Sequence, residues 1–408
     1  MNPFRTFVLA RSICWAGNAV TLVALPLFVY QQGGSALLTG VAFAVESMPY
    51  LLFGLFAGAT ADRFDRKRIL VVSQILSAVI LSTIPLAAVT GIASIAHVLV
   101  VGFAVSTLFV YYDAATFGVV PALVGRDGIA DATALLVTTG TVIGIAGPLL
   151  GGIAASALSP AGAIAIDAGC YVVAALITAT VAVPASTGAA DADRRVWQQI
   201  SEGLQYIWRQ PVIRMLTLVG IGVSMANGVV VGLMVVVGVR RLGLDDGDAR
   251  LGALYAATAL GAFLISLVSA HIQRRMGTGK ITLVGIGVAA SAMLVWAHTT
   301  SFAASLLILV AYQAANTMVV VNGIVVRQSI TPDHLQSRVN TTARMIAMGG
   351  TPFGATLGGA VAEVAGAGVA LSIGAAALVL AVAGGLHAGV GRLPLLAELS
   401  AGAHGKGE

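Results

Sequence analysis

Residues 58–68 read GATADRFDRKR, and six of the seven residues from Asp62 to Arg68 are charged. Over the whole chain only 10% of residues are charged, whereas 58% are apolar and the mean hydropathy is +0.95. Soluble domains carry about 25% charged residues, so a soluble fold of this composition would lack the polar side chains to cover its surface. The charged stretch therefore forms a short loop between two apolar segments of an integral membrane protein.

Segments like the two that flank this loop recur along the chain. A helix needs about 20 apolar residues to cross the hydrocarbon core of a bilayer. Twelve segments meet this requirement, near 7–30, 36–60, 69–91, 95–119, 132–157, 162–183, 212–238, 250–271, 281–298, 302–326, 339–363 and 367–390. The sequence thus predicts an all-α membrane protein with twelve transmembrane helices in two pseudo-symmetric six-helix bundles, residues 1–184 and 212–391, a linker at 185–211 and a tail at 392–408.

Basic residues predict the orientation of these spans. If the N-terminus is cytoplasmic, 17 of the 22 Lys and Arg residues fall in inner loops and tails, and three fall in outer loops: Arg240, Arg241 and Arg250. Basic residues concentrate on the cytoplasmic side of membrane proteins. We therefore expect a multi-pass protein of the inner (plasma) membrane with both termini in the cytoplasm. Arg11 interrupts the first apolar run, which favours an uncleaved first span over a signal peptide.

The linker contains an amphipathic pattern, RRVWQQISEGLQYIWR at 194–209. Its apolar side chains recur at helical spacing, and charged residues lie between them: the apolar set is Val196, Trp197, Ile200, Leu204, Ile207 and Trp208. This pattern predicts a helix in the inner membrane interface, with Trp at headgroup depth. A direct role of the two Trp residues in substrate binding is the alternative.

Short motifs recur in the two halves of the chain. GNAV at 17–20 is echoed by ANGV at 226–229, and GPLLGG at 147–152 by TPFGATLGG at 351–359. Such weak repeats are common in secondary transporters. Glycine pairs four residues apart (Gly54–Gly58, Gly147–Gly151 and Gly354–Gly358) predict close helix crossings.

The stretch GATADRFDRK resembles the loop signature between spans two and three of the major facilitator superfamily. Gly58, Asp62, Arg63, Arg66 and Lys67 occupy the positions of that signature, whereas Asp65 stands where Gly is usual. The resemblance implies that these residues form a conformational latch at the inner ends of spans two and eleven. From the residues themselves, topology and local charge pairing explain the cluster equally well.

Within that superfamily the chain looks most similar to the bacterial exporters of enterobactin and macrolides. The resemblance rests on FVLARSICWAGNAVTLVALPLFVY in the first span, ADRFDRKRIL, GPLLGG with IDAGCYVVAA, and QSITPDHLQSRV. GPLLGG also resembles the core of the antiporter motif of drug/proton exchangers, which assigns Gly147, Pro148, Gly151 and Gly152 to that motif. The expected upstream glycine is replaced by Ile143.

The sequence offers no support for an enzyme, a cofactor, a metal site or a nucleic-acid partner. MGTGKIT at 276–282 lacks the first glycine of a phosphate-binding loop and has Ile281 after Lys280, so ATP is not indicated. Cys14 and Cys170 lie inside apolar segments and form no metal or disulfide pattern. The expected partners are a small-molecule substrate, protons and membrane lipids, and a monomer suffices.

Three carboxylates lie inside predicted spans rather than at a terminal residue, and each charge there costs about 2.5–3.5 kcal/mol on insertion scales. Glu46 lies near the middle of the span at 36–60, three residues before Pro49. We expect it either to carry the coupling proton or to be a static partner of Arg11. Asp113, toward the inner half of its span, handles a proton or a cation, or else pairs with Arg11 or caps a helix. Asp167 is the third proton-coupling candidate, with a structural role as the alternative, and is expected close to the outer end of its span, where water reaches it.

Two arginines lie inside spans and are the predicted charge partners of these acids. Arg11 and Arg344 are each one to two turns from the inner face, and either snorkels to the headgroups or neutralises Glu46 or Asp113. Because their depths agree best, Arg11 and Asp113 are the predicted pair. The candidates for lining a substrate cavity are Asn18, Tyr111, Asn227 and Asn316, for which hydrogen bonding and packing between helices are the alternative.

These observations favour a secondary active transporter that exports an amphipathic small molecule (a drug, a macrolide or a siderophore-like compound) by alternating access, driven by protons. In this hypothesis protonation of Glu46 weakens a pairing with Arg11 and permits the switch. An uptake symporter on the same fold is one alternative, because fold does not fix direction. A membrane receptor or scaffold that no longer transports is the other.

Overall fold

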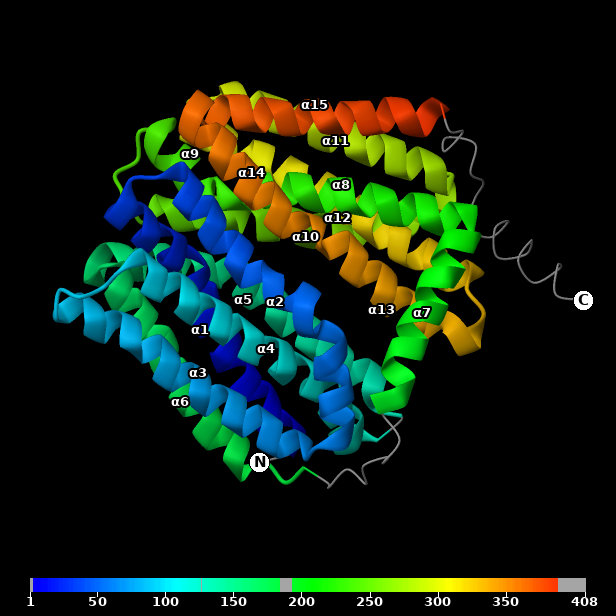
Figure 1. Ribbon diagram of the computed structural model, residues 1–408, viewed down its shortest axis with the longest axis horizontal. Coiled ribbons are helices and arrows are strands. Elements are labelled where there is room, and N and C mark those ends of the chain that lie inside the picture. Colours follow the sequence, from blue (N-terminus) through cyan, green and yellow to red (C-terminus); the bar gives the residue numbers. More distant parts are fainter. Residues whose placement is uncertain (1–2, 126, 184–192, 388–408) are drawn as a thin grey trace, which may run out of the picture. The chain divides into compact units, whose positions relative to one another are not determined.

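A computed structural model describes residues 3–125, 127–183 and 193–387, and all regular secondary structure in these residues is helical (Figure 1). A few helical side chains, including that of Asp62, are outside the described part. The chain forms two compact units. The first comprises Met1–Val196 with Leu244–Ala256, and the second Trp197–Gly243 with Ala257–Glu408.

The first unit is built from six long helices. They are α1 (Pro3–Gly33), α2 (Ala36–Arg63), α3 (Arg66–Val89), α4 (Ile95–Val124), α5 (Ile129–Leu158) and α6 (Pro160–Thr180), with the first turns of α10 (Arg250–Arg275) added. α1 packs against α5 and α6, α2 against α4, and α3 against both α4 and α6. α1 also contacts α2 and α4, so its side chains face those of four other helices of the unit.

The second unit holds the remaining helices: α7 (Asp193–Arg209) from residue 197, α8 (Pro211–Gly232), α9 (Met234–Arg240), the rest of α10, α11 (Thr278–His298), α12 (Phe302–Ile330), α13 (Asp333–Met348), α14 (Gly350–Ala365) and α15 (Ala367–His387). α8 packs against α14 and α13, and α11 packs against α12 and α15. α8 has the position in this unit that α1 has in the first.

Ten helices within the described residues are long and apolar enough to cross a membrane: α1 to α6, α8, α10, α11 and α12. Each lies within a few residues of a predicted span. The predicted span at 339–363 is instead divided at Gly349 into α13 and α14. Pro352 has no amide hydrogen to donate to the carbonyl one turn earlier, which favours a break there. The predicted span at 212–238 is also divided, at Leu233, directly after Gly232, and glycine is a poor helix former.

Side-chain caps fix several helix starts in the loops. The side chains of Ser35, Ser94 and Ser301 each accept a hydrogen bond from the backbone N–H three residues later. Asp65 does the same for α3, accepting from the Arg68 N–H at 2.9 Å. Its φ of −58° is ordinary for any residue, so the turn does not require the glycine usual at this position.

Two of the three predicted glycine pairs lie at close helix contacts. An added Cβ on Gly151 would lie 2.9 Å from the Val20 Cα of α1, and one on Gly354 would overlap the Met225 carbonyl of α8. The partner glycines, Gly147 and Gly358, face the same two helices. Nothing lies within 4 Å of an added Cβ at Gly54 or Gly58, so the crossing predicted there is not found within the described residues.

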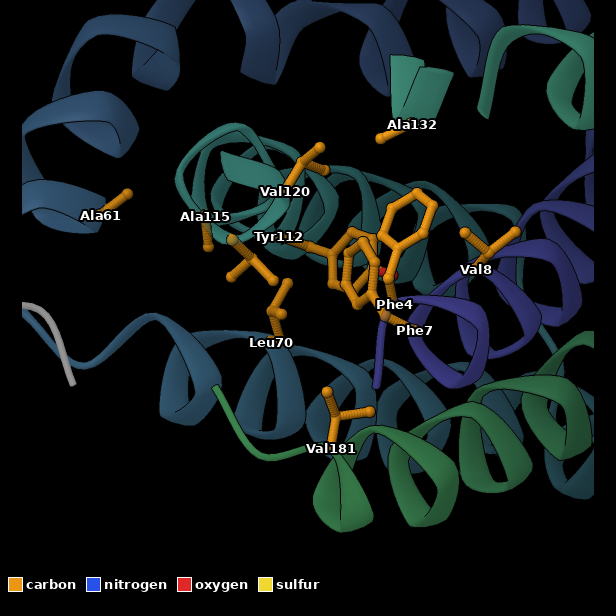
Figure 2. Packing of buried hydrophobic residues seen from close by; sticks show 11 residues of the cluster. Phe4, Phe7, Val8, Ala61, Leu70, Tyr112, Ala115, Val120, Ala132 and Val181 are labelled. Atoms are coloured by element: carbon orange, nitrogen blue, oxygen red, sulfur yellow. The ribbon is translucent and has the colours of Figure 1, made fainter. Parts of the chain in front are cut away.

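A buried cluster closes one end of the first unit (Figure 2). Phe4 and Phe7 from α1 pack against Tyr112 of α4 and Leu70 of α3. Phe7 and Leu70 have no exposed surface. This packing anchors the first turns of α1 next to α4, and so fixes the depth at which Arg11 and Asp113 face each other.

The predicted amphipathic stretch forms the helix α7, in which the side chains of Val196, Trp197 and Ile200 fall outside the described residues. Part of the described apolar side contacts protein. Ile207 is buried in a cluster with Ile213, Val339 and Ala343, and Tyr206 Oη donates a hydrogen bond to the Ile330 carbonyl at 3.2 Å. Trp208 and Leu204 remain exposed. The tertiary structure thus divides a face that the sequence assigned entirely to the membrane interface.

Candidate functional site

Arg11 and Asp113 form an ion pair, as predicted. Arg11 Nη2 donates to Asp113 Oδ1 at 2.8 Å, and Nη1 donates to Thr116 Oγ1 at 2.5 Å. Tyr50 Oη of α2 donates to the second carboxylate oxygen, Oδ2, also at 2.8 Å. The pair therefore joins α1, α2 and α4, and both oxygens of Asp113 are hydrogen-bonded.

Aromatic rings enclose the Arg11 guanidinium. Its Cζ lies 4.4 Å from the centroid of the Trp15 ring and 5.6 Å from that of Tyr112. Rings at these distances attract a cation electrostatically. Arg11 is thus held by one carboxylate and two aromatic faces, all within the first unit.

Glu46 does not pair with Arg11, which contradicts one of its two predicted roles. Among the described residues no side chain forms a hydrogen bond or ion pair with Glu46, although it is half-buried in the middle of α2. The mechanism in which protonation of Glu46 breaks a contact with Arg11 is therefore wrong for this conformation. Glu46 faces a cavity instead.

This cavity has a volume of about 340 Å³ and lies inside the first unit. That volume is at the lower end of the range for small-molecule sites, about 300–1,000 Å³. Four of its lining residues are aromatic: Trp15, Phe43, Phe109 and Tyr171. Asn18, Ser47 and Ser106 add polar groups. Aromatic walls with a few polar groups suit an amphipathic ligand.

Asp167 lines the same cavity from α6. Its Oδ2 accepts a hydrogen bond from Thr21 Oγ1 at 2.6 Å, whereas Oδ1 is buried without a partner among the described residues. The residue has no exposed surface, so the prediction that water reaches it is wrong. Gly17 makes this burial possible, because a Cβ there would overlap Asp167 Oδ1.

The cavity thus brings together two carboxyl groups that are 121 positions apart in sequence, Glu46 and Asp167. Neither has a cationic partner in the described part of the chain, whereas Asp113 has Arg11. An unpaired carboxylate is costly in a low-dielectric site, which favours its neutral form or a bound cation. Chemically, this arrangement can take up and release a proton.

The charged loop at 62–68 is held by backbone contacts at the end of the first unit. Arg66 Nη1 donates to the Gly118 carbonyl of α4 at 3.1 Å, and Nε donates to the Ala61 carbonyl at 3.4 Å. A Cβ on Gly118 would overlap this guanidinium. Arg63 ends α2 and is exposed, and Lys67 lies in the first turn of α3. The predicted contact of Asp62 falls outside the described residues.

The four residues of the antiporter-like motif are buried on α5. Gly147 and Gly151 face α1, while a Cβ on Gly152 would overlap the Ala249 carbonyl that precedes α10. In return, a Cβ on Gly252 would overlap the Pro148 carbonyl. The motif therefore lets α5 approach two helices of the first unit closely, which side chains larger than hydrogen would prevent.

The other predicted site residues are scattered. Asn18 accepts from Tyr171 Oη at 2.8 Å and lines the cavity, whereas Tyr111 lies outside its lining on α4. Asn227 on α8 and Asn316 on α12 belong to the second unit, and the Asn227 Oδ1 is buried without a partner in the described part. Arg344 is exposed on α13, and no ion pair of it occurs among the described residues.

Three residues of the network were missed from the sequence: Tyr50, Thr116 and, as a cation partner, Trp15. Helical spacing contained a signal for two of them. Thr116 follows Asp113 by three residues and Trp15 follows Arg11 by four, whereas Tyr50 reaches Asp113 from another helix, α2. Side chains at these spacings share one face of a helix, so each is a candidate neighbour of the in-span charge beside it.

Residues 7–355 match the family model of the Major Facilitator Superfamily. The multidrug efflux pump Tap of Mycolicibacterium fortuitum is 27% identical over 379 residues, which cover 90% of each chain. The enterobactin exporter EntS of Citrobacter koseri is 23% identical over 69% of this chain and 66% of its own. The macrolide efflux protein A of Streptococcus pyogenes is 24% identical over 54% of this chain and 56% of its own.

Solved transporter structures share the fold at low sequence identity. The nucleoside transporter NupG superposes with a TM-score of 0.80 at 11% identity, covering 95% of this chain and 99% of its own. A bacterial homologue of the iron transporter ferroportin in an inward-facing state gives 0.72 at 14% identity, covering 94% and 98%. The chain is therefore a multi-pass membrane transporter that belongs to the Major Facilitator Superfamily.

Proposed function

We propose that this transporter is a proton-driven exporter of an amphipathic small molecule, and that the coupling proton resides on Glu46. The observation that carries the proposal is the cavity in the first unit, where Glu46 and Asp167 share an aromatic-walled space without a cationic partner among the described residues. Export is supported by the names of the relatives, which are a multidrug efflux pump and exporters of enterobactin or macrolides. We infer no enzymatic step.

Glu46 and Asp167 differ from Asp113 in the group that neutralises their charge. Asp113 has the Arg11 guanidinium as its counter-charge and the Tyr50 hydroxyl as a second donor, so its charge stays in place. Glu46 is instead neutralised by a proton or by a cationic ligand that enters the cavity. Protonation of Glu46 and binding of the substrate therefore exclude each other in this cavity. This competition couples proton flux in one direction to substrate flux in the other.

The remaining parts of the cycle follow the family pattern. We propose twelve spans in two six-helix bundles that rock around the substrate, with both termini cytoplasmic and the protein in the inner (plasma) membrane as a monomer. Gly58, Asp62, Arg63, Arg66 and Lys67 act as a latch that biases the two states. The hydrogen bond from Arg66 to the Gly118 carbonyl near the end of α4 supports this, because a latch residue must be held in place by one of the helices that it joins.

The test uses everted membrane vesicles whose interior has been acidified, with a fluorescent pH probe. Candidate compounds (a macrolide, a catecholate siderophore and lipophilic amines) are added to wild type, Glu46→Gln, Asp167→Asn and the control Asp131→Asn. Asp131 is an exposed acid in the first turn of α5, outside the cavity. We expect compound-dependent alkalinisation in wild type and Asp131→Asn, and its loss in Glu46→Gln.

The outcomes separate the hypotheses. Equal alkalinisation in wild type and Glu46→Gln would remove Glu46 as the proton carrier, and its loss in Asp167→Asn alone would assign the proton to Asp167. A compound that is depleted from these vesicles rather than accumulated would identify an uptake symporter. Binding of a compound without any flux would favour a receptor.

A further inference from the structure

A basic pocket lies in the second unit, where α9 and α11 end and α15 begins. It has a volume of about 520 Å³, and its polar end is formed by Arg240, Arg241, His298, Gly366, Ala367 and Gly368. All of these residues belong to the second unit, and Figure 1 shows α9 beside the first turns of α15. The pocket is separate from the cavity of Glu46, and the transport cycle proposed above does not use it.

The described residues that line this pocket include two arginines and no acid. Arg240 lies 3.9 Å from Glu363, measured between Nη2 and Oε2. Arg241 has no ion pair among the described residues, and its Nε is buried without a hydrogen-bond partner there. The pocket therefore carries an excess of positive charge, centred on Arg241.

Arg241 also lies against the positive end of a helix. An added Cβ on Gly368 would lie 2.5 Å from Arg241 Nη1 and 2.8 Å from the Ala297 carbonyl oxygen, so glycine is what lets the guanidinium approach α15. The first amides of a helix have no carbonyl partner inside it, and they carry a partial positive charge. The Ala297 carbonyl at the end of α11 offsets part of the repulsion between Arg241 and these amides, and an anion between them would offset the rest. At the start of α15 the Val369 and Ala370 amides donate to the Gly366 carbonyl at 3.1 and 3.2 Å, whereas no acceptor for the Ala367 and Gly368 amides occurs among the described residues. These two amides and Arg241 thus form a binding site for an oxyanion.

The rest of the pocket follows α15 away from the arginines and is apolar except for Ser372, whose hydroxyl donates to the Gly368 carbonyl at 2.8 Å. Val369, Ile373 and Ala376 line it at successive turns of the helix. Val369 and Ile373 are 44% and 54% exposed, so this part of the pocket is open at the surface of the helix. An anion that fits both ends has a charged head and a hydrocarbon chain.

We propose that this pocket binds an anionic phospholipid, with its phosphate at Arg241 and the start of α15 and an acyl chain along Val369, Ile373 and Ala376. In the proposed orientation the site is on the outer side of the membrane, where basic residues are otherwise scarce in this chain. A zwitterionic lipid fits less well, because its ammonium would lie near two arginines. The proposal does not depend on export, so either can fail alone.

The experiment measures lipid retention. The full chain, purified in detergent, is mixed with dioleoylphosphatidylglycerol or dioleoylphosphatidylcholine, and bound lipid is counted by native mass spectrometry. Inorganic phosphate is the competitor. The variants are Arg241→Gln, Arg241→Lys, Ile373→Trp and the control Arg250→Gln, which removes an exposed arginine that donates to Asp248 at 2.6 and 2.8 Å.

We expect wild type and Arg250→Gln to retain phosphatidylglycerol over phosphatidylcholine. Arg241→Gln should weaken retention about tenfold or more, the scale of a lost hydrogen bond to a charged group, and Arg241→Lys should weaken it less. Ile373→Trp, which fills the apolar part, should weaken lipid retention without changing the effect of phosphate.

Three results would overturn the proposal: equal retention of the two lipids, equal losses in Arg241→Gln and Arg250→Gln, or full displacement by phosphate with no effect of Ile373→Trp. The last would identify a site for a free anion. If Arg241→Gln does not fold, Arg241→Lys and Ile373→Trp still decide between these outcomes.

Discussion

The Arg11–Asp113 pair shows how this chain retains charge inside a membrane. The side chains are only 9% and 15% exposed, and the pair is completed by Thr116, Tyr50 and the Trp15 ring. These contacts offset much of the cost of desolvating two charges, although Arg11 Nε is buried without a hydrogen-bond partner among the described residues. Removing one partner leaves the other charged and buried, which is far more costly than removing both.

The first prediction uses this asymmetry. Arg11→Gln should destabilise the protein by about 3–5 kcal/mol, because Asp113 loses its counter-charge. The double variant Arg11→Gln with Asp113→Asn should recover most of that loss. Denaturation of the purified protein in detergent measures both, and additive losses in the double variant would show that the pair is not a unit.

At the scale of the helix, Asp65 explains why the charged loop ends where it does. Its carboxylate caps α3 by accepting from the Arg68 N–H, while Arg66 in the same turn reaches across to the Gly118 carbonyl of α4. The loop therefore contains residues with local structural tasks alongside those that the family pattern assigns to a latch.

The second prediction concerns this cap. Asp65→Ala should cost about 1 kcal/mol, the usual value for a lost N-cap, and Asp65→Asn should cost much less because an amide oxygen accepts the same hydrogen bond. Thermal denaturation of the two variants gives the comparison. A cost that is equal in Asp65→Ala and Asp65→Asn would instead assign the effect to charge.

Helix contacts through glycine provide the third prediction. Gly151→Leu and Gly354→Leu should reduce stability by about 1–3 kcal/mol or more, because each side chain would collide with backbone of the facing helix. Gly54→Leu is the matched control, since nothing lies within 4 Å of an added Cβ there. The yield of monodisperse protein after size exclusion and its melting temperature report the difference. A loss in Gly54→Leu as large as in the other two would show that volume alone is responsible.

At the scale of the whole molecule, the proposed topology places loops alternately on the two sides of the membrane. Its test needs single reporter cysteines, and the native Cys14 and Cys170 are first replaced by alanine. Gln32 lies shortly before α2 and Phe64 directly after it, and both are exposed. The two positions therefore report on opposite ends of one span.

The fourth prediction is that a membrane-impermeant maleimide labels Gln32→Cys in intact cells and leaves Phe64→Cys unlabelled. Everted vesicles should reverse this result, because the cytoplasmic face is then outside. Labelling of Phe64→Cys in intact cells would show that the topology is opposite to the proposed one. The lipid pocket would then lie on the cytoplasmic side.

The sequence by itself determined the membrane class, the family resemblance and the position of the ten described helices that are long and apolar enough to cross a membrane, because apolar runs are local properties of the chain. The loop signature around Asp62 and the amphipathic pattern of α7 are local in the same sense. The pairing of Arg11 with Asp113 was also within reach, since membrane depth limits the partners of a buried charge.

Only the tertiary structure decided which helices meet, and thus which side chains share a space. Glu46 and Asp167 are on α2 and α6, and no spacing rule connects them; the approach of α1 to α6 at Gly17 brings Asp167 into the wall of the cavity. The burial of Ile207 against α13 and the approach of Arg241 to α15 have the same origin. Contacts between distant segments depend on how whole helices pack, and the sequence of a single span, apolar all round, does not name the neighbour that covers it.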